Sequence, residues 1–365
     1  MTRTILRLAC ALIVTVPLLA GVPARAAVPD GLTAVDIHPT GWMSSSAYDV
    51  NDRGEVIVTA VNVVDSVIQP PLGFVWRAGR HTALRPLPGG TGTLPRDINE
   101  RGEVAGFCQS VAHPARPCLW RHGRPIDLGT LDERGTGTAL VINDRGEVVG
   151  ENQTFIRGGE TRAFLWRRGT LTDLGGVGHR SATGINNSSQ VIGVHYTDAG
   201  RRAFLWQRGT LTDLGTLGGD EAVPADINEH GQIVGTSTTA SGAQHAFLWQ
   251  DGRMIDLGAP SGDSGAVAVN DRGQVLGWTS SADGTGQVFR WHRGVRTEFA
   301  GYPGDLNERG WIAGTTTGDP RRAFLWRNGR MVTGGAATTA TVLNNRGLLA
   351  GSARASGGDR ATVWR

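Results

Sequence analysis

The hydrophobic positions of this chain fall in short stretches that are rich in β-branched and aromatic residues and are separated by turn-forming residues. No stretch carries apolar residues at helical spacing over about eleven positions, so the pattern indicates strands rather than helices. Four stretches follow one another, as at 181–186, 191–193, 203–206 and 211–214, and the same order then begins again. This pattern predicts a repeated unit of four short antiparallel strands.

An asparagine ends the first stretch of every unit, and in seven of eight copies a glycine follows three positions later. The asparagines are Asn51, Asn99, Asn143, Asn186, Asn228, Asn270, Asn307 and Asn344. An asparagine side chain can accept hydrogen bonds from the backbone of its own turn, and glycine adopts the positive φ that such turns need. We therefore interpret the motif as a turn, with repeated ligand binding by the asparagines as the alternative.

A tryptophan ends the third stretch of every unit. The tryptophans are Trp76, Trp120, Trp166, Trp206, Trp249, Trp291, Trp326 and Trp364. A glycine three residues after each of the first seven predicts a second turn, between the third and fourth strands. We expect these tryptophans to form the core between units, together with phenylalanines two positions before them, such as Phe164, Phe204, Phe247 and Phe324.

Successive repeat asparagines lie 37 to 48 residues apart, a range that includes the length of a propeller blade. A four-stranded sheet alone would expose both faces, and radial stacking covers each face with a neighbouring blade. The sequence therefore predicts an all-β fold, a β-propeller of four-stranded antiparallel blades. We expect eight blades, or seven if one divergent copy forms no blade. An open solenoid is the rival, and it would need polar capping repeats at both ends.

Two further features support a closed ring. The residue four positions before each repeat asparagine is Ala or Pro, which suits a strand crowded near a central axis. The eighth unit ends at Trp364-Arg365, before a fourth strand, and residues 32–37 look like a fourth strand without a blade. We predict that this N-terminal strand closes the last blade and so removes two exposed sheet edges.

Residues 1–26 have the pattern of a secretory signal peptide, with a basic start, an apolar run at 8–20 and a cleavage site at Ala24-Arg25-Ala26. A membrane anchor is the alternative, but the run is too short to cross a bilayer. We expect a secreted, extracellular monomer in which residues 27–365 form a single propeller domain of eight repeats. No membrane span is expected after cleavage.

Two cysteines, Cys108 and Cys118, remain in the expected mature chain. In an oxidising compartment such a pair forms a disulfide, and the ten-residue spacing suits a bridge across one hairpin. A metal site is the alternative, with His113 and His122 nearby. We expect the disulfide and no metal site.

The charge distribution argues against nucleic acid as a partner. The formal net charge is +3, but the first 26 residues hold three arginines and no acid, so the rest of the chain has 33 arginines against 33 acidic residues. A neutral chain without a basic block lacks the electrostatic footprint of nucleic-acid binding. The sequence also lacks nucleophile-elbow, zinc-protease, phosphate-loop and dinucleotide fingerprints, and we expect no cofactor and assign no catalytic residue.

Four acidic residues form a candidate binding site. The residue two positions before the repeat asparagine is Asp49, Asp97, Asp226 or Asp305 in four copies. Positions two apart in a strand share a face, so these carboxylates are expected near one end of the central channel, where they would bind a cation or a sugar. The alternative is that each carboxylate caps its own turn or pairs with an arginine.

Two tryptophans depart from the repeat and are further candidates for ligand binding. Trp311 stands where most other copies have Glu or Gln, and Trp278 follows Gly277, where small or polar residues are common. Exposed tryptophans would stack on sugar rings. The alternative is that they fill space where the last units are shorter.

The repeat resembles that of the HAF-repeat extracellular proteins. His245-Ala246-Phe247 is the triplet that names this family, and Arg replaces the His at Arg162, Arg202 and Arg322. The similarity runs from Asp49 to the C-terminus and is weaker in the first and sixth copies. It implies a secreted repeat protein and supplies no catalytic residues.

These features favour a secreted, non-catalytic binding or scaffold module for an unknown extracellular ligand, such as a glycan, a protein or another cell-surface component. The alternative is a secreted enzyme that acts on polysaccharides through carboxylates at the propeller axis. That chemistry would need an acid and a base about 5–9.5 Å apart across a cleft. The regular repeats and short loops leave little sequence for such a cleft, which favours binding.

Overall fold

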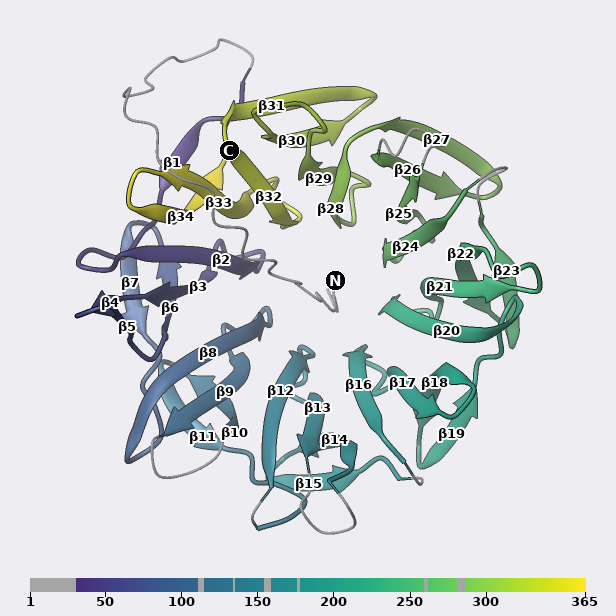
Figure 1. Cartoon of the computed structure of the whole chain (residues 1–365), viewed down its shortest axis with the longest axis horizontal. Helices are drawn as coiled ribbons and strands as arrows, with labels where there is room; N and C mark the ends of the chain where they lie inside the picture. Colours follow the sequence, from purple (N-terminus) through teal and green to yellow (C-terminus); the bar gives the residue numbers. More distant parts are fainter. Residues whose placement is uncertain are drawn as a thin grey trace.

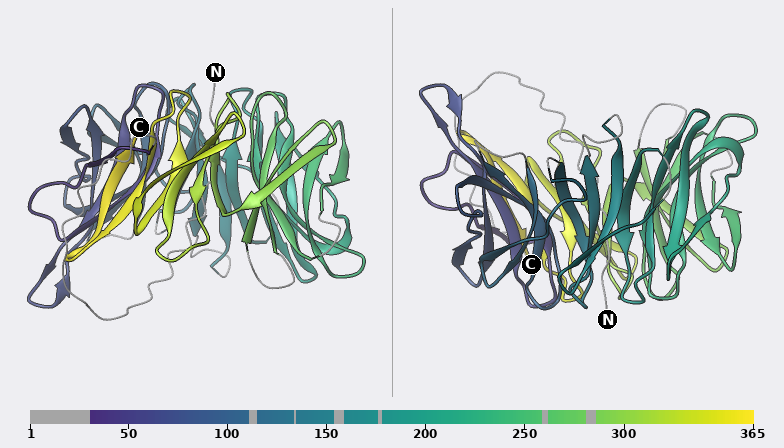
Figure 2. Two further views of the ribbon diagram at one scale, coloured as in Figure 1. Left: turned by 90° about the horizontal axis from the view of Figure 1, so that it is seen from above. Right: turned by 90° about the horizontal axis from the view of Figure 1, so that it is seen from below.

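The described residues form a ring of eight four-stranded antiparallel sheets around a central axis (Figure 1). The structure is a computed structural model, and it describes residues 31–110, 115–133, 135–153, 159–175, 178–258, 262–280 and 286–365. Figure 2 shows the ring from two sides, with the strands of each blade running between its two faces. The predicted eight-bladed propeller is confirmed. The expected signal peptide lies outside the described residues.

Blades 2 to 7 are each built from four consecutive strands, and the first strand of each lies nearest the axis (Figure 1). Blade 1 comprises β2 (Ser44–Val50), β3 (Val56–Val61), β6 (Leu72–Arg77) and β7 (Arg80–Ala83), and blade 2 comprises β8 (Gly90–Ile98), β9 (Val104–Ser110), β10 (Arg116–Arg121) and β11 (Arg124–Asp127). Blade 3 comprises β12 (Thr136–Ile142), β13 (Val148–Gln153), β14 (Thr161–Arg167) and β15 (Thr170–Asp173). Blade 4 comprises β16 (Arg180–Ile185), β17 (Val191–Thr197), β18 (Gly200–Gln207) and β19 (Thr210–Asp213).

Blades 5 to 7 repeat this order along the chain. Their strands are β20 (Gly218–Ile227), β21 (Ile233–Thr239), β22 (Gln244–Gln250), β23 (Arg253–Asp256); β24 (Ser264–Val269), β25 (Val275–Ser280), β26 (Gly286–His292), β27 (Val295–Ala300); and β28 (Tyr302–Leu306), β29 (Ile312–Thr315), β30 (Arg322–Arg327), β31 (Arg330–Ala336). Among the described residues there is no helix long and apolar enough to cross a membrane.

Blade 8 joins the two ends of the described chain. It contains β32 (Thr338–Leu343), β33 (Leu349–Ala355), β34 (Gly358–Trp364) and the N-terminal strand β1 (Ala34–Asp36). β1 pairs antiparallel with β34, with Ala34 opposite Trp364. The predicted closing strand is therefore confirmed, and β34 has a hydrogen-bonded partner on both sides.

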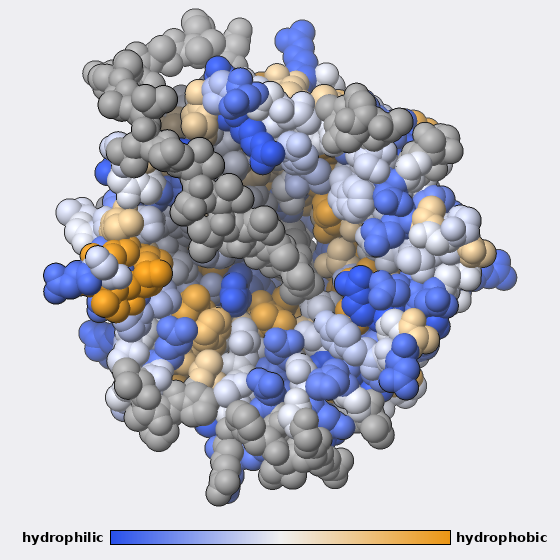
Figure 3. Space-filling model, in the orientation of Figure 1, coloured by the Kyte–Doolittle hydropathy of each residue, from blue (hydrophilic) through white to orange (hydrophobic). Residues whose placement is uncertain are grey.

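A small hairpin of β4 (Val63–Val64) and β5 (Val67–Ile68) is added between the second and third strands of blade 1. Its four apolar side chains are all exposed, from 39% for Val63 to 72% for Ile68. Figure 3 shows them as an apolar patch on the rim of the ring. This hairpin is an addition to the four-stranded unit rather than part of the blade core.

A β-bulge in the first strand follows the small residue that stands four positions before the repeat asparagine. In blade 5 the register of β20 shifts after Pro224, which pairs with Gly235 of β21. A Cβ on Gly235 would collide with the carbonyl oxygen of Val223 and would lie 2.9 Å from the Phe247 ring. In blade 5 the position opposite the bulge is therefore too crowded for a larger residue, whereas blade 1 has Val58 there.

The phenylalanines, more than the tryptophans, fill the core between blades. Five phenylalanines two positions before a repeat tryptophan are at most 1% exposed; they are Phe164, Phe204, Phe247, Phe289 and Phe324. Among the repeat tryptophans, Trp120, Trp166 and Trp364 are buried, and the other five are partly buried. Every repeat tryptophan belongs to or packs against a core cluster, as expected, but most are less deeply buried than the phenylalanines because each tryptophan stands near the end of its strand, next to the turn.

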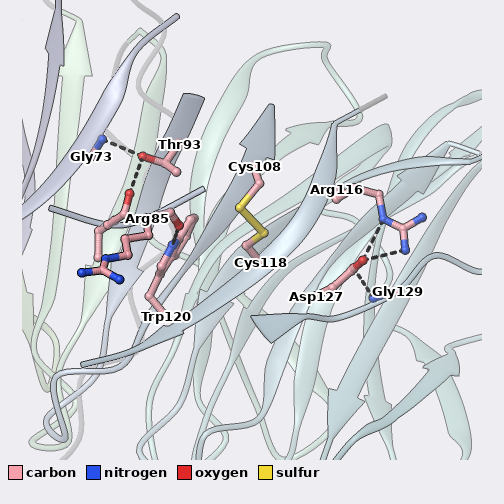
Figure 4. The surroundings of a disulfide bond; sticks show 10 residues. Gly73, Arg85, Thr93, Cys108, Arg116, Cys118, Trp120, Asp127 and Gly129 are labelled. Atoms are coloured by element: carbon pink, nitrogen blue, oxygen red, sulfur yellow. Dashed lines mark hydrogen bonds and ion pairs between the residues drawn. A yellow bond between two sulfur atoms is a disulfide. The ribbon is translucent and has the colours of Figure 1, made fainter. Parts of the chain in front are cut away.

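The predicted disulfide is present within blade 2, where it links β9 to β10 (Figure 4). The Cα atoms of Cys108 and Cys118 are 6.0 Å apart, and both residues belong to a core cluster that includes Trp120. The indole N–H of Trp120 donates to the carbonyl oxygen of Arg85 at 2.7 Å, which ties the third strand of blade 2 to the segment that leaves blade 1.

We expect the substitution Gly235→Ala to lower the free energy of unfolding by about 1–3 kcal/mol, as overpacking a filled interior does. The measurement is chemical denaturation followed by circular dichroism. Gly318→Ala is the matched control, because a Cβ at Gly318 has no atom within 4 Å and no positive φ is recorded there. Equal stability of the two variants would show that the bulge does not require glycine.

Candidate functional site

The eight repeat asparagines form a closed ring of hydrogen bonds around the axis. Each side-chain amide donates to the backbone carbonyl oxygen of the repeat asparagine in the next blade, at 2.9 to 3.1 Å. The last bond runs from Asn344 in blade 8 back to Asn51 in blade 1, at 2.9 Å. All eight asparagines are at most 5% exposed. The asparagines therefore connect every blade to the next.

Each asparagine also builds its own turn, as the sequence predicts. In blade 5 the side-chain oxygen of Asn228 accepts the backbone N–H groups of His230 at 3.1 Å and Gln232 at 2.9 Å. The N–H of Gly231 donates to the Asn228 carbonyl at 3.1 Å, and Gly231 has a φ of +75°. One side chain thus holds a turn with its oxygen and the neighbouring blade with its nitrogen.

The residue directly after each asparagine forms a second closed ring. Its backbone N–H donates to a side-chain oxygen of the matching residue in the next blade, with shortest distances of 2.7 to 3.1 Å. Six of these eight residues are acidic: Asp52, Glu100, Asp144, Glu229, Asp271 and Glu308; the other two are Asn187 and Asn345. Sequence analysis missed this ring, although the acidic residue after the repeat asparagine was a visible signal.

Crowding of these carboxylates has an electrostatic consequence at Glu229. Burial raises its pKa, the N–H of Asn187 acts against that shift, and the nearby carboxylates of Asp271 and Asp144 raise the pKa further. Acidic groups are therefore concentrated on this side of the ring, which we call the turn face because it carries the asparagine turns. In the described part of the chain, no group of three or more His, Cys, Asp or Glu residues is placed to hold a metal ion.

The substitution Asn228→Asp tests whether the hydrogen bonds between blades stabilise the protein in addition to the turns. The aspartate keeps the oxygen that accepts the two turn N–H groups but loses the amide that donates to Asn270. We expect a loss of about 2–4 kcal/mol in unfolding free energy, because a buried carboxylate then faces a carbonyl oxygen. The measurement is denaturation in urea at neutral pH.

Asp271→Asn is the control for this experiment. It changes a residue of the second ring to the amide that blades 4 and 8 carry at the same position, and its oxygen can still accept the N–H of Glu229. A loss within about 0.5 kcal/mol is expected for it. If Asn228→Asp were no less stable than Asp271→Asn, the inter-blade bonds would not support the ring.

The four candidate aspartates each connect two blades. One carboxylate oxygen accepts the N–H of the following residue at 2.8 to 3.0 Å. The other accepts an N–H from the first strand of the next blade at 2.7 to 3.3 Å; the donors to Asp49, Asp97, Asp226 and Asp305 are Ile98, Ile142, Val269 and Leu343. Local capping was among the expectations, and the second bond was not.

The surroundings of these aspartates leave little space for a ligand. Asp97, Asp226 and Asp305 are at most 7% exposed. A gap between Asp49 and Asp97 has a volume of about 10 Å³, which is the room that one water molecule needs. Burial raises the pKa of Asp226 well above its ordinary value, against the effect of its two backbone N–H donors.

The structure places Trp278 and Trp311 apart, in different blades. Trp278 lies in β25 and packs over Gly265, where a Cβ would come within 2.7 Å of its indole nitrogen. Trp311 contacts the guanidinium groups of Arg309 and Arg327, whose carbon atoms are 5.1 and 5.6 Å from its ring centre. Both tryptophans thus have neighbours that cover part of their rings.

Trp311 belongs to a series of side-chain pairs on the turn face. The residue four after the repeat asparagine meets the residue directly after the repeat tryptophan. In blades 1, 2 and 3 the pairs are Glu55–Arg77, Glu103–Arg121 and Glu147–Arg167, at 3.4, 2.7 and 3.7 Å. In blades 4 and 5 they are Gln190–Gln207 at 3.4 Å and Gln232–Gln250 at 2.6 Å. The turn face therefore changes from ionic to neutral pairs around the ring.

Glu103 shows how the ionic pairs of the turn face affect a carboxylate. Burial alone would raise its pKa, but hydrogen bonds from Asn99, Arg101 and Arg121 outweigh burial and hold the pKa below its usual value. A lowered pKa in the folded state means that ionised Glu103 stabilises the fold above the pKa of the unfolded chain. That contribution is lost as pH falls through the folded pKa.

We expect Glu103→Gln to cost about 1 kcal/mol at neutral pH and to cost progressively less as the solution is acidified. Glutamine fits the site, because blades 4, 5 and 6 carry it at this position. Urea denaturation across a pH series measures the difference from the native protein. Glu298→Gln, which removes an ion pair whose Glu side chain is 37% exposed, should change little at any pH. If the loss of unfolding free energy caused by Glu103→Gln did not change with pH, the stabilisation would not come from the ionised form of Glu103.

A hollow on the turn face lies between the turns of blades 5 and 6. It has a volume of about 470 Å³, which is within the usual range for small-molecule sites. Residues from both blades form its walls, among them His230, Gln232 and Gln250 from blade 5 and Trp291 and His292 from blade 6. Neither the aspartates nor the departing tryptophans of the sequence analysis line it. We call it the blade 5–6 cleft.

These features define the class of the protein, a closed eight-bladed β-propeller with a hydrogen-bonded asparagine ring. No protein-family model matches its sequence, and no characterised protein sequence matches it. Among solved structures, the β-propeller domain of the Trilobed protease from Pyrococcus furiosus is similar, with a TM-score of 0.51 and 11% identity, over 80% of this chain and 96% of that one.

Two larger peptidases also contain a similar domain. A puromycin-hydrolyzing peptidase of Mycobacterium tuberculosis matches with a TM-score of 0.48 and 14% identity over 92% of this chain. Pyrococcus horikoshii acylaminoacyl peptidase matches with a TM-score of 0.47 and 13% identity over 80% of this chain. The match spans 56% and 53% of those two proteins. At 11% identity the similarity to the Trilobed protease domain shows the propeller fold alone.

Proposed function

We propose that this protein is a secreted, non-catalytic binding or scaffold module. The observation that carries the proposal is the use of the axial carboxylates. Asp226 and Asp305 each accept backbone N–H groups from two blades, so they hold the ring together. A general acid or base must instead come within hydrogen-bond reach of the proton that it transfers on a substrate.

Three features support secretion and an extracellular role. The basic and apolar start of residues 1–26 has the pattern of an export signal. The Cys108–Cys118 bridge suits an oxidising compartment. The repeat also resembles the HAF-repeat extracellular proteins, as in His245-Ala246-Phe247. The ligand we propose is an extracellular glycan or protein, bound by a single copy of this chain.

The experiment applies protein recovered from the culture medium to arrays of glycans and extracellular-matrix proteins, and incubates the same panel with it in solution. We expect at least one component to be retained and to be recovered unchanged, as judged by mass spectrometry. A binding module takes up no more ligand than its sites hold, whereas an enzyme turns over many substrate molecules per copy.

Two outcomes would contradict the proposal. Cleavage of a polysaccharide in excess over the protein would favour the alternative, an enzyme acting through the axial carboxylates. Absence of any retained component, with the protein folded by circular dichroism, would remove the evidence for a binding role.

A further inference from the structure

We infer that the blade 5–6 cleft binds a neutral carbohydrate, an inference that rests on the proposed binding function and adds its site and ligand class. Four properties of the cleft lead to this conclusion: where it occurs in the ring, the groups that line it, its balance of charge, and its size.

The cleft lies beside the neutral side-chain pair of blade 5 on the turn face. Six of the eight copies have arginine two positions after the repeat asparagine, and blade 5 has His230 there. In blade 2, by contrast, the guanidinium group of Arg101 contacts Glu103, and Arg121 donates to the same carboxylate at 2.7 Å. Blade 5 has the shorter, neutral Gln232–Gln250 pair in place of these charged groups. His230 and this neutral pair therefore line the cleft at the positions where blade 2 has the charged group of Arg101 and its ion pair.

The amides along the cleft form a chain with remaining hydrogen-bonding capacity. The Asn228 amide donates to Gln232 at 2.6 Å, the Gln232 amide donates to Gln250 at 2.6 Å, and the Gln250 amide donates to Asp251 at 3.0 Å. Each glutamine amide has two N–H donors and an oxygen with two lone pairs. These bonds use one N–H of each glutamine and fix the plane of each amide. A second N–H on each is left for a ligand hydroxyl.

Trp291 adds an apolar surface to these polar groups. It lines the cleft, is partly buried and packs against the core cluster of blades 5 and 6. Indole combines a large apolar face with limited conformational freedom, and the C–H face of a pyranose ring is itself apolar. Planar amides beside an indole ring therefore match a sugar, whose hydroxyl groups surround an apolar ring face.

The formal charges of the side chains that line the cleft sum to zero, because Asp251 and Asp271 balance Arg272 and Arg293. The site therefore has no excess positive charge to attract a phosphate or a carboxylate ligand. The volume of about 470 Å³ suits a small ligand of one or a few sugar units. A neutral mono- or oligosaccharide is the ligand class that meets both conditions.

The test restores to blade 5 the ion pair that blades 1 to 3 carry. The double variant Q232E/Q250R places the Glu–Arg pair of blade 2 on the same backbone positions, with no change in net charge, and puts a longer side chain at the cleft. The matched control is Q190E/Q207R in blade 4, which makes the same exchange in the other Gln–Gln pair, outside the lining of the cleft. A single variant, H230R, restores the common arginine by an independent route.

The probe is an array of neutral oligosaccharides, followed by calorimetric titration of the best-bound sugar. We expect native protein and Q190E/Q207R to bind equally, and Q232E/Q250R and H230R to bind at least about tenfold more weakly. Thermal unfolding of all variants confirms that weaker binding is not loss of fold, since each new residue already occurs at the same position in another blade.

Three results would overturn the inference. Equal sugar binding by native protein and Q232E/Q250R would move the site elsewhere and leave the proposed function standing. Binding of a matrix protein without any sugar binding would also leave the proposed function standing but would remove the sugar. Absence of all binding by folded native protein would contradict both.

Discussion

The fold depends on one hydrogen bond that is repeated eight times, from the side-chain amide of an asparagine to the backbone carbonyl of the next asparagine around the axis. Because the bond from Asn344 to Asn51 spans 293 positions of sequence, the chain can complete the set only by closing into a ring. Each amide is buried, so a missing partner would leave a polar group without water. The ring thus connects local turn formation to global closure.

The need to connect neighbouring blades also accounts for the four aspartates that the sequence suggested as a ligand site. The sequence could predict the turns, the four-stranded unit, the small residue near the axis and the closing strand at 34–36, because each follows from local pattern and from the need to cover sheet edges. It could not predict the role of Asp226. Side chains normally alternate between the two faces of a strand, and a β-bulge between Pro224 and Asp226 interrupts this alternation. The carboxylate is thereby placed between two blades.

Two other features depended on contacts between residues that are distant in sequence. The tryptophans and phenylalanines of one strand have similar apolar character, and only the packing of neighbouring blades decides that Phe247 is fully buried and Trp249 partly so. The pairs on the turn face join residues 16 to 22 positions apart, from Trp311 with Arg327 to Glu55 with Arg77. A pattern read along the chain does not reveal that these positions touch, so the blade 5–6 cleft could not be predicted.

The repeat therefore separates two kinds of position. The repeat asparagine holds the ring, and its replacement would break a hydrogen bond shared between two blades. The residues four after the asparagine and one after the tryptophan contact each other on the turn face and vary from Glu–Arg to Gln–Gln without changing the backbone. Replacing one such pair by another costs at most about 1 kcal/mol, because it leaves the asparagine ring untouched. A closed propeller can therefore change the side chains of one groove while the ring stays intact, and blades 4, 5 and 7 show such changes in the Gln190–Gln207 and Gln232–Gln250 pairs and at Trp311.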